Sequence, residues 1–338
     1  MLIWKTQEAP SADFRSAWDA VLRSCMHAHF ALERRWLEWE AGHGRHAIAA
    51  VEADGPEPII VAARQVHGVL ISGWPWRWQA GRASGADATL GGLSLADARR
   101  ASRMLTEAGG GARVRMYVPI PAGRSRRTAR AGTTTLLPLT ADLKARPPSG
   151  NKRREARKAA AAGWVVEAAT TADEFRGYAE LQLANERRRR GRAAALPDDP
   201  APGESWREWE HPWMWLLVAK RDGVIGAGSG FGRSAGGMVD YRANASTTEA
   251  RDAGANALLA VEAARLAGQA GHRFMNWGGA TTFKRSLGGD TLPTWEWLGG
   301  GGAWALPNAI ESLWKAARSE AAAGVKALRR RGGASRKG

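Results

Sequence analysis

A stretch near the C-terminal end of the chain combines two glycine pairs with an aromatic residue and a lysine. It reads GGATTFKRSLGGDT, residues 278–291, and holds Phe283 and Lys284 between the glycine pairs. A lysine ammonium held in place by a turn can stabilise a developing oxyanion or contact a phosphate. The alternative is an ordinary surface lysine after a strand, because the chain has 49 lysine and arginine residues. Lys284, with Phe283 as its packing neighbour, is our candidate catalytic residue.

Other candidates lie on predicted strands. The segment MVDYRANAS, residues 238–246, carries Asp240 and Tyr241, which we predict to contact an acceptor amine or to accept its proton. An ordinary strand pair of tyrosine and aspartate is the alternative. Trp277 precedes the first glycine pair and is a third candidate for substrate contact.

A glycine-rich strand adds a possible binding surface. GAGSGFG places Gly226, Gly228, Gly230 and Gly232 two residues apart, so on an extended chain all four face the same side. A face without side chains lets a substrate approach the sheet, and we predict contacts at Gly228 and Gly230. The same glycines would also suit a bulge or tight packing.

Basic residues gather in three clusters and give the chain a formal net charge of +16. Such a charge attracts polyanions in a salt-dependent way, although solvated helix faces or the codon bias of a GC-rich genome would also produce it. The first cluster lies in the predicted helix NKRREARKAAAAG, residues 151–163, and the second ends the following helix. The members are Lys152, Arg153, Arg154, Arg157 and Lys158 in the first, Arg187 to Arg190 with Arg192 in the second, and Arg124, Arg126, Arg127 and Arg130 in the third.

Composition excludes several classes of protein. No apolar run approaches the roughly 18 residues that cross a bilayer, and the N-terminus lacks the pattern of a secretory signal. The single cysteine, Cys25, allows no internal disulfide, and the histidines lack carboxylate or cysteine partners at ligand spacing. We therefore expect a cytoplasmic protein without a metal, present as a monomer or a loose dimer.

Helices and strands alternate along the 338 residues, which is typical of an α/β or α+β fold with two domains. The first part has a helical pattern over residues 11–40, strands near 47–53, 58–65 and 67–73, a helix over 93–109 and a strand over 114–120. The second part has helices over 151–163, 171–192 and 250–271. A strand hairpin and a third strand lie between the last two helices, and a fourth and a fifth strand follow the last one. We predict domains at 1–140 and 141–305, followed by a C-terminal helix and basic tail at 306–338.

This order of elements, ending in FKxSLGG, resembles the FemAB-type acyltransferases of the GNAT superfamily. The similar pieces lie between residues 133 and 297, and the first part fits by element order alone. They are NKRREARKAAAAGW, WLLVAKRDGVIGAGSGFG, YRANASTTEARDAGANALLAVEAARLAGQAG and NWGGATTFKRSLGG. The resemblance implies two tandem GNAT-like domains, each with a mixed central sheet flanked by helices, and an acceptor cleft between them.

The resemblance also implies an activity. FemAB-type enzymes form an amide by moving an amino acid from charged tRNA onto an amine of a small molecule or peptide, in natural-product or cell-wall precursor biosynthesis. Lys284 would then contact the oxyanion or the donor end, without a covalent intermediate or a cofactor. The tRNA acceptor stem would bind Lys152, Arg153, Arg154, Arg157, Lys158, Arg187 and Arg188, because separated basic clusters suit a path of phosphates.

Two alternatives remain. The first is an acyl-CoA-dependent N-acyltransferase on the same fold, which would hold pyrophosphate in a glycine-rich loop before the long helix. Here that loop reads RDAGAN, residues 251–256, where Asn256 replaces a small residue and Asp252 adds a negative charge. The second alternative is a non-catalytic RNA-binding protein that retains the fold.

Overall fold

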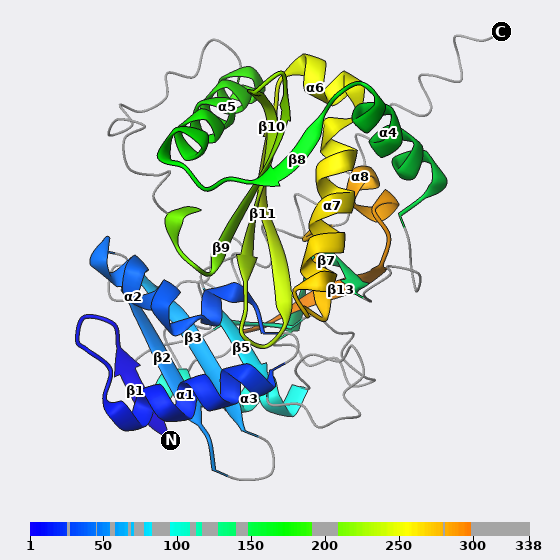
Figure 1. Cartoon of the computed structure of the whole chain (residues 1–338). Coiled ribbons are helices and arrows are strands. Elements are labelled where there is room, and N and C mark those ends of the chain that lie inside the picture. The colour runs from blue at the N-terminus through cyan, green and yellow to red at the C-terminus, as the bar shows by residue number, and fades with distance from the viewer. Residues whose placement is uncertain are drawn as a thin grey trace, which may run out of the picture.

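Two sheets organise the chain in a computed structural model (Figure 1). One sheet is built from the N-terminal strands, and the other from strands of both the middle and the C-terminal parts. The structure describes residues 1–25, 28–44, 46–54, 58–66, 69–70, 78–82, 95–108, 113–116, 128–139, 148–190, 209–279 and 281–298. The predicted C-terminal segment 306–338 lies outside these ranges.

The first sheet has five strands, and all of its described pairings are antiparallel. Its path runs β1-β2-β3-β4, with β5 also paired to β3. The strands are β1 (Leu2–Lys5), β2 (Ala47–Glu52), β3 (Ile59–Val66), β4 (Val69–Leu70) and β5 (Trp78–Arg82), accompanied by α3 (Leu95–Glu107).

The predicted helix over residues 11–40 is two helices joined by a 3-10 turn. They are α1 (Ala12–Ser24) and α2 (Arg34–Gly42), with η1 (Phe30–Leu32) between them. Ser11 is the N-cap of α1. His29 is the N-cap of η1, and its side chain accepts a hydrogen bond from the N–H of Ala31. Phe14 and Trp18 on α1 are fully buried, because a spacing of four puts both on the helix face that covers the sheet.

The second sheet has eight strands in the order β6-β13-β7-β12-β11-β10-β9-β8. Among the described strand pairs of this sheet, β11–β12 alone is parallel, so the sheet is mixed. The strands β6 and β7 come from the part of the sequence predicted as the first domain, so strand pairing crosses residue 140. The strands are β6 (Arg113–Met116), β7 (Thr128–Pro138), β8 (Val165–Ala168), β9 (Met214–Arg221), β10 (Val224–Arg233), β11 (Met238–Ser246), β12 (Phe274–Asn276) and β13 (Asp290–Leu298).

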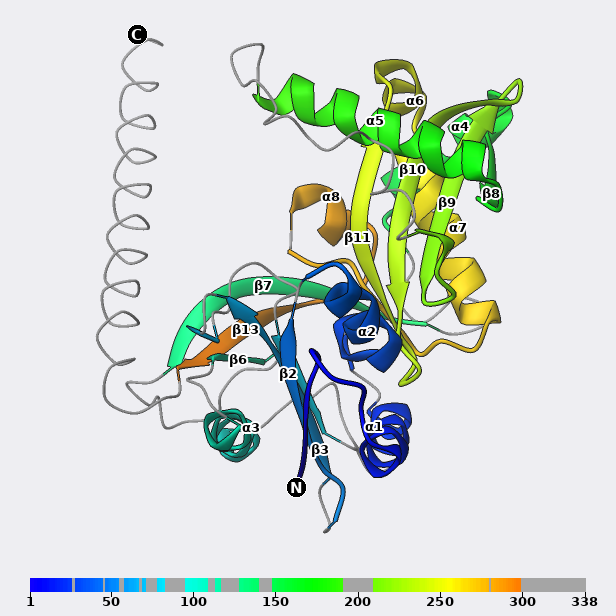
Figure 2. The same cartoon turned by 90° about the vertical axis from the view of Figure 1, so that its left-hand side faces the viewer.

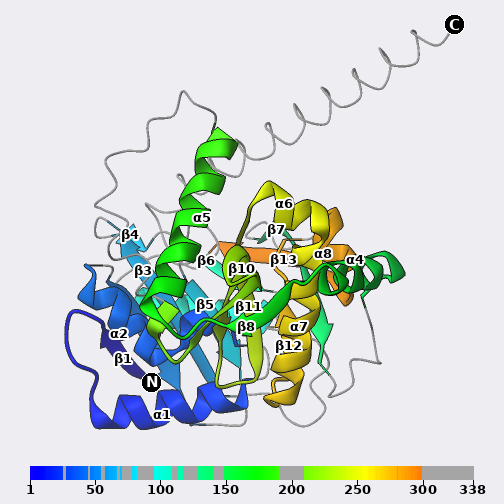
Figure 3. The ribbon, with the colours of Figure 1, turned by 45° about the horizontal axis from the view of Figure 1, so that its top comes forward.

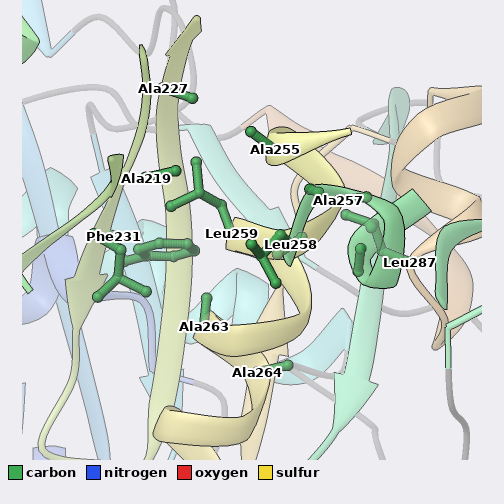
Figure 4. Packing of buried hydrophobic residues seen from close by; sticks show 14 of the residues in the cluster. Ala219, Ala227, Phe231, Ala255, Ala257, Leu258, Leu259, Ala263, Ala264 and Leu287 are labelled. Atoms are coloured by element: carbon green, nitrogen blue, oxygen red, sulfur yellow. The ribbon is translucent and has the colours of Figure 1, made fainter. Parts of the chain in front are cut away.

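Helices cover both faces of the second sheet. The helices α4 (Gly150–Ala161) and α7 (Ala255–Gln269) pack together on one side, and α5 (Ala172–Arg190) lies on the other (Figure 3). Figure 4 shows Leu259 and Ala263 of α7 beside Phe231 of β10. The alanine-rich face of α7 lets the helix approach the sheet closely.

The helix predicted over residues 250–271 is broken at Gly254. The break separates α6 (Thr248–Ala253) from α7, and Gly254 has a φ of 91°, which favours glycine. A Cβ at this position would lie 2.7 Å from the carbonyl oxygen of Glu155 on α4. Close approach of α4 therefore requires glycine there. None of the described helices has the length and apolar character needed to cross a bilayer.

Candidate active site

Strands β11 and β12 separate after a short parallel pairing. β12 lies between β11 and β7, and its register with β11 covers only Met238–Asp240. Beyond it the chain stays with β7, where the N–H of Trp277 donates to the carbonyl of Thr135 at 2.9 Å. On this side the rest of β11 has no strand partner in the described structure. We call residues Tyr241–Ser246 the open edge of β11. Helix α8 (Thr282–Ser286) lies beside it (Figure 2).

Lys284 on α8 reaches the first residue of this edge. Thr281 caps the short helix by accepting the N–H of Lys284 at 3.3 Å. The Nζ atom lies 4.7 Å from the centroid of the Tyr241 ring, in a cation–π contact. A Cβ on Gly278, if this residue had one, would lie 3.3 Å from Nζ, and the φ of Gly278 is 72°. The glycine turn therefore leaves room for the ammonium.

The electrostatic state of Lys284 is unusual for a chain rich in ion pairs. No carboxylate of the described residues forms an ion pair with its half-buried side chain. Burial lowers the pKa of Lys284 from its ordinary value. The ammonium can thus bind an incoming anion without first breaking a salt bridge, and it gives up its proton more readily than an exposed lysine.

Phe283 joins α8 to the basic helix α4. Its ring packs partly buried against the core, and Lys152 Nζ lies 5.0 Å from the ring centroid. The N–H of Ser149, the N-cap of α4, donates to the carbonyl of Ser286 at 2.9 Å. The first turn of α4 is therefore fixed next to the candidate lysine.

The predicted basic residues fall into two separate regions. On α4, Arg153, Arg154, Arg157 and Lys158 are exposed, whereas Lys152 is half-buried and pairs with Glu155. Arg187 and Arg188 are exposed on α5, across the sheet from α4 (Figure 3). Of the basic residues whose side chains the structure describes, those on α4 adjoin α8. Most of the third predicted cluster lies outside the described residues.

The Tyr241 ring, which contacts the Lys284 ammonium, packs against two other aromatic rings. It meets Phe231 at 5.7 Å and Trp277 at 6.0 Å between centroids, both edge to face. Burial raises the pKa of Tyr241, whose hydroxyl is hydrogen-bonded to Ser229. The phenol is therefore neutral, which argues against its predicted role as a proton acceptor. Trp277 is 1% exposed, and its Nε1 has no acceptor among the described residues.

Asp240 faces the opposite side of the sheet from Tyr241. Its carboxylate accepts the N–H of Phe30 at 2.9 Å and the amide of Asn276 at 2.8 Å. His29 Nε2 lies 3.5 Å away and carries the ring proton, because Nδ1 accepts the N–H of Ala31. Burial raises the pKa of Asp240 to about 7. This carboxylate joins the two parts of the chain and lies away from Lys284.

Aromatic rings occupy the glycine face that we predicted for substrate. A Cβ on Gly228 would lie 2.4 Å from the Tyr178 ring, and a Cβ on Gly230 would lie 2.0 Å from the Trp209 ring. Gly226 faces the other side, against Trp164, so the prediction of four glycines on one side is wrong for this residue. The reason is a register shift between Ile225 and Ala227, which reverses the alternation.

Sequence reasoning missed a polar row beside Tyr241. Ser229, Asn244 and Asn256 form a chain of hydrogen bonds between β10, β11 and α7. Asn256 also donates to Ser246 at 3.2 Å. Asparagine and serine at alternating positions among alanine and glycine were the available signal. Among the described residues, no group of three or more His, Cys, Asp or Glu side chains has the arrangement of a metal site.

The two sheets and the helices that flank them form a mixed α/β fold, which confirms the predicted fold class, and this fold is shared with FemX. No family model matches the sequence, and no curated protein matches it either.

Solved structures show the same fold at low identity. FemX is 14% identical, over 87% of this chain and 97% of FemX, with a TM-score of 0.58. A conserved protein of unknown function from Bacteroides thetaiotaomicron VPI-5482 is 12% identical, over 87% of this chain and 99% of that protein, with a TM-score of 0.50. A tandem GNAT protein from the clavulanic acid biosynthesis pathway is 12% identical over 76% of this chain and 83% of its own, with a TM-score of 0.38 that is too low to show a shared fold.

Proposed function

We propose that this protein transfers an amino acid from charged tRNA to an amine of a small molecule or peptide. The observation that carries the proposal is the Lys284 ammonium, which has no carboxylate partner in the described structure and lies over Tyr241 beside the open edge of β11. The exposed basic face of α4 is fixed to the same helix. A shared fold with FemX supports the class of reaction.

The reaction needs little beyond positioning and charge. A neutral amine attacks the ester carbonyl of the donor, a C–N bond forms, and the C–O bond to the ribose breaks. Lys284 stabilises the negative oxygen of the tetrahedral intermediate, and its lowered pKa suits it to protonate the departing ribose oxygen. The attacking amine loses one proton to solvent. The Tyr241 ring keeps the ammonium in position throughout.

The donor would approach along α4. Arg153, Arg154, Arg157 and Lys158 offer exposed cations to the phosphates of an acceptor stem. Phe283 and Ser286 connect this helix to Lys284, so the end of the stem and the candidate lysine lie on neighbouring elements.

Mass spectrometry of a reaction with defined donors tests the proposal. The protein is incubated with a full set of charged tRNAs and a metabolite extract as the source of amines. We expect a new amide that carries an amino acid, and treatment of the charged tRNA with RNase should abolish it. Product formed from acyl-CoA without tRNA would instead identify an acyl-CoA-dependent transferase and overturn the proposal.

A further inference from the structure

Asn244 presents a fixed hydrogen-bond acceptor at the open edge of β11. Its Nδ2 donates to the carbonyl of Gly228 at 3.0 Å, to Ser229 Oγ at 3.0 Å and to Asn256 Oδ1 at 3.2 Å. A backbone carbonyl can only accept, so the amide nitrogen has to face Gly228 and Oδ1 has to face away. The neighbours thus fix the orientation of the amide.

The oxygen of this amide has no donor in the described part of the chain. Asn244 is half-buried, and its Oδ1 is absent from the buried unpaired atoms of the described residues. The oxygen is therefore open to solvent or to a ligand. An accessible acceptor on a side chain that is otherwise immobilised is suited to specific recognition.

Asn244 and Lys284 adjoin the same tyrosine. Tyr241 pairs with Phe231 and Asn244 pairs with Ser229, and a register shift between Gly230 and Phe231 keeps both side chains on the α7 face. The hydroxyl of Tyr241 and the amide of Asn244 meet at Ser229. The ammonium of Lys284 lies over the ring of that tyrosine. A small acyl group beside Tyr241 would therefore have a cation and a neutral acceptor as neighbours.

We infer that Asn244 Oδ1 accepts a hydrogen bond from the α-ammonium of the donor's aminoacyl group. This inference rests on the proposed function and adds the determinant that selects aminoacyl groups over plain acyl groups. Lys284 attracts the carbonyl oxygen, whereas Asn244 binds the nitrogen one carbon away from that carbonyl. An acetyl group has no N–H to offer Asn244, and a carboxylate at this position would be repelled by the amide oxygen.

Two stable donor analogues test the inference. The first is 3′-(glycylamino)-3′-deoxyadenosine, and the second is 3′-(acetylamino)-3′-deoxyadenosine, which lacks only the α-amine. We expect the wild-type protein to bind the glycyl compound at least about tenfold more tightly in titration calorimetry, because hydrogen bonds to charged groups contribute about 1.5–3 kcal/mol. Asn244→Ala should reduce this ratio to less than about twofold.

The ratio of the affinities for the two analogues does not depend on the fraction of the protein that is folded. Two further variants test whether the effect is specific to the Asn244 side chain. Asn244→Asp should keep or increase the preference, because a carboxylate attracts the ammonium more strongly. Asn185→Ala removes an amide from α5 and should keep the wild-type ratio. An unchanged ratio in both Asn244 variants, or no preference in the wild type, overturns the inference alone. Binding of neither analogue, together with product from acyl-CoA, overturns the proposed function and this inference with it.

Discussion

Lys284 differs from the other basic residues in its surroundings. It lies over Tyr241, next to a glycine turn and without a carboxylate partner in the described structure, whereas Lys220 contacts two glutamates. We expect Lys284→Ala to lower turnover by about 10² to 10³, the cost of losing one group that stabilises an oxyanion. Initial rates at saturating donor measure this change.

The neighbouring exposed arginine provides the control for this variant. Arg285→Ala removes a positive charge from the same helix and should leave turnover close to that of the wild type. Thermal unfolding should be similar for both variants, because Lys284 makes no ion pair with a described carboxylate that folding would lose. Wild-type turnover in Lys284→Ala would rule out the catalytic role.

At the residue scale, the sequence predicted the glycine turn next to Lys284 correctly, because the motif there is distinctive. It did not predict which side of the sheet each strand residue faces. The motif around Phe283 and Lys284 indicated a glycine turn, and the structure contains one. Adjacent residues of a strand face opposite sides, so Asp240 and Tyr241 could not both contact the same substrate. The amide of Asn244 was missed because its importance depends on partners from α7 and β10.

At the scale of elements, β10 shows why a glycine-rich strand can be structural. Gly230→Ala would place a Cβ 2.0 Å from the Trp209 ring, which has to move. We expect a loss of about 1–3 kcal/mol in the free energy of unfolding, as overpacking of a core typically costs. Denaturant titration measures it, and Gly150→Ala is the control because a Cβ there meets nothing within 4 Å. Equal stabilities would contradict the packing role.

Helix α4 is the element that we expect to bind the donor's phosphates. Reversal of Arg153, Arg154 and Arg157 to glutamate should weaken tRNA binding and reduce the slope of affinity against salt by about one per lost phosphate contact. Filter binding at several salt concentrations gives both quantities.

Two arginines on the other face of the sheet provide a control, which shows whether tRNA binding depends on the α4 residues or only on the total positive charge. The double variant Arg187→Glu and Arg188→Glu also reverses exposed charges, but it does so on α5. We expect it to change the salt slope less than the α4 variant does. An equal or larger change would show that α5 carries the binding surface.

At the scale of the whole molecule, the half-buried carboxyl group of Glu33 and the buried one of Asp240 join the N-terminal part to the hairpin of β10 and β11. Glu33 accepts the N–H of Ala235, and Asp240 accepts the N–H of Phe30. Burial raises the pKa of Glu33 from 4.5 to about 7 and that of Asp240 from 3.8 to about 7. Both contacts link the segment around η1 to the second sheet.

These shifts predict that stability falls as the pH rises. Between the unfolded and the folded pKa values the folded protein keeps protons that the unfolded chain has lost, so the free energy of unfolding decreases with pH up to about 7 and then levels. Thermal unfolding should therefore occur at a lower temperature at pH 8 than at pH 5. Glu33→Gln should reduce this difference, whereas the exposed Glu180→Gln should leave it intact. The same pH dependence in Glu33→Gln as in the wild type would exclude Glu33 as a source.

The order of helices and strands along the chain was readable from local patterns, but the pairing of distant strands was not. Composition predicted α4, and apolar spacing predicted a helix where α7 lies. Nothing local indicated that β13 pairs with both β6 and β7, because such pairing depends on contacts more than 150 residues apart in sequence. The domain boundary near residue 140 stays a prediction.

The position of β13 has a consequence for synthesis on the ribosome. This strand is the last that the structure describes, and it lies between β6 and β7, which are made some 150 residues earlier. A nascent chain that ends before Asp290 has both neighbours but lacks the strand that joins them. The edges of β6 and β7 that pair with β13 would then remain exposed until β13 has been made, a period in which a chaperone could bind them.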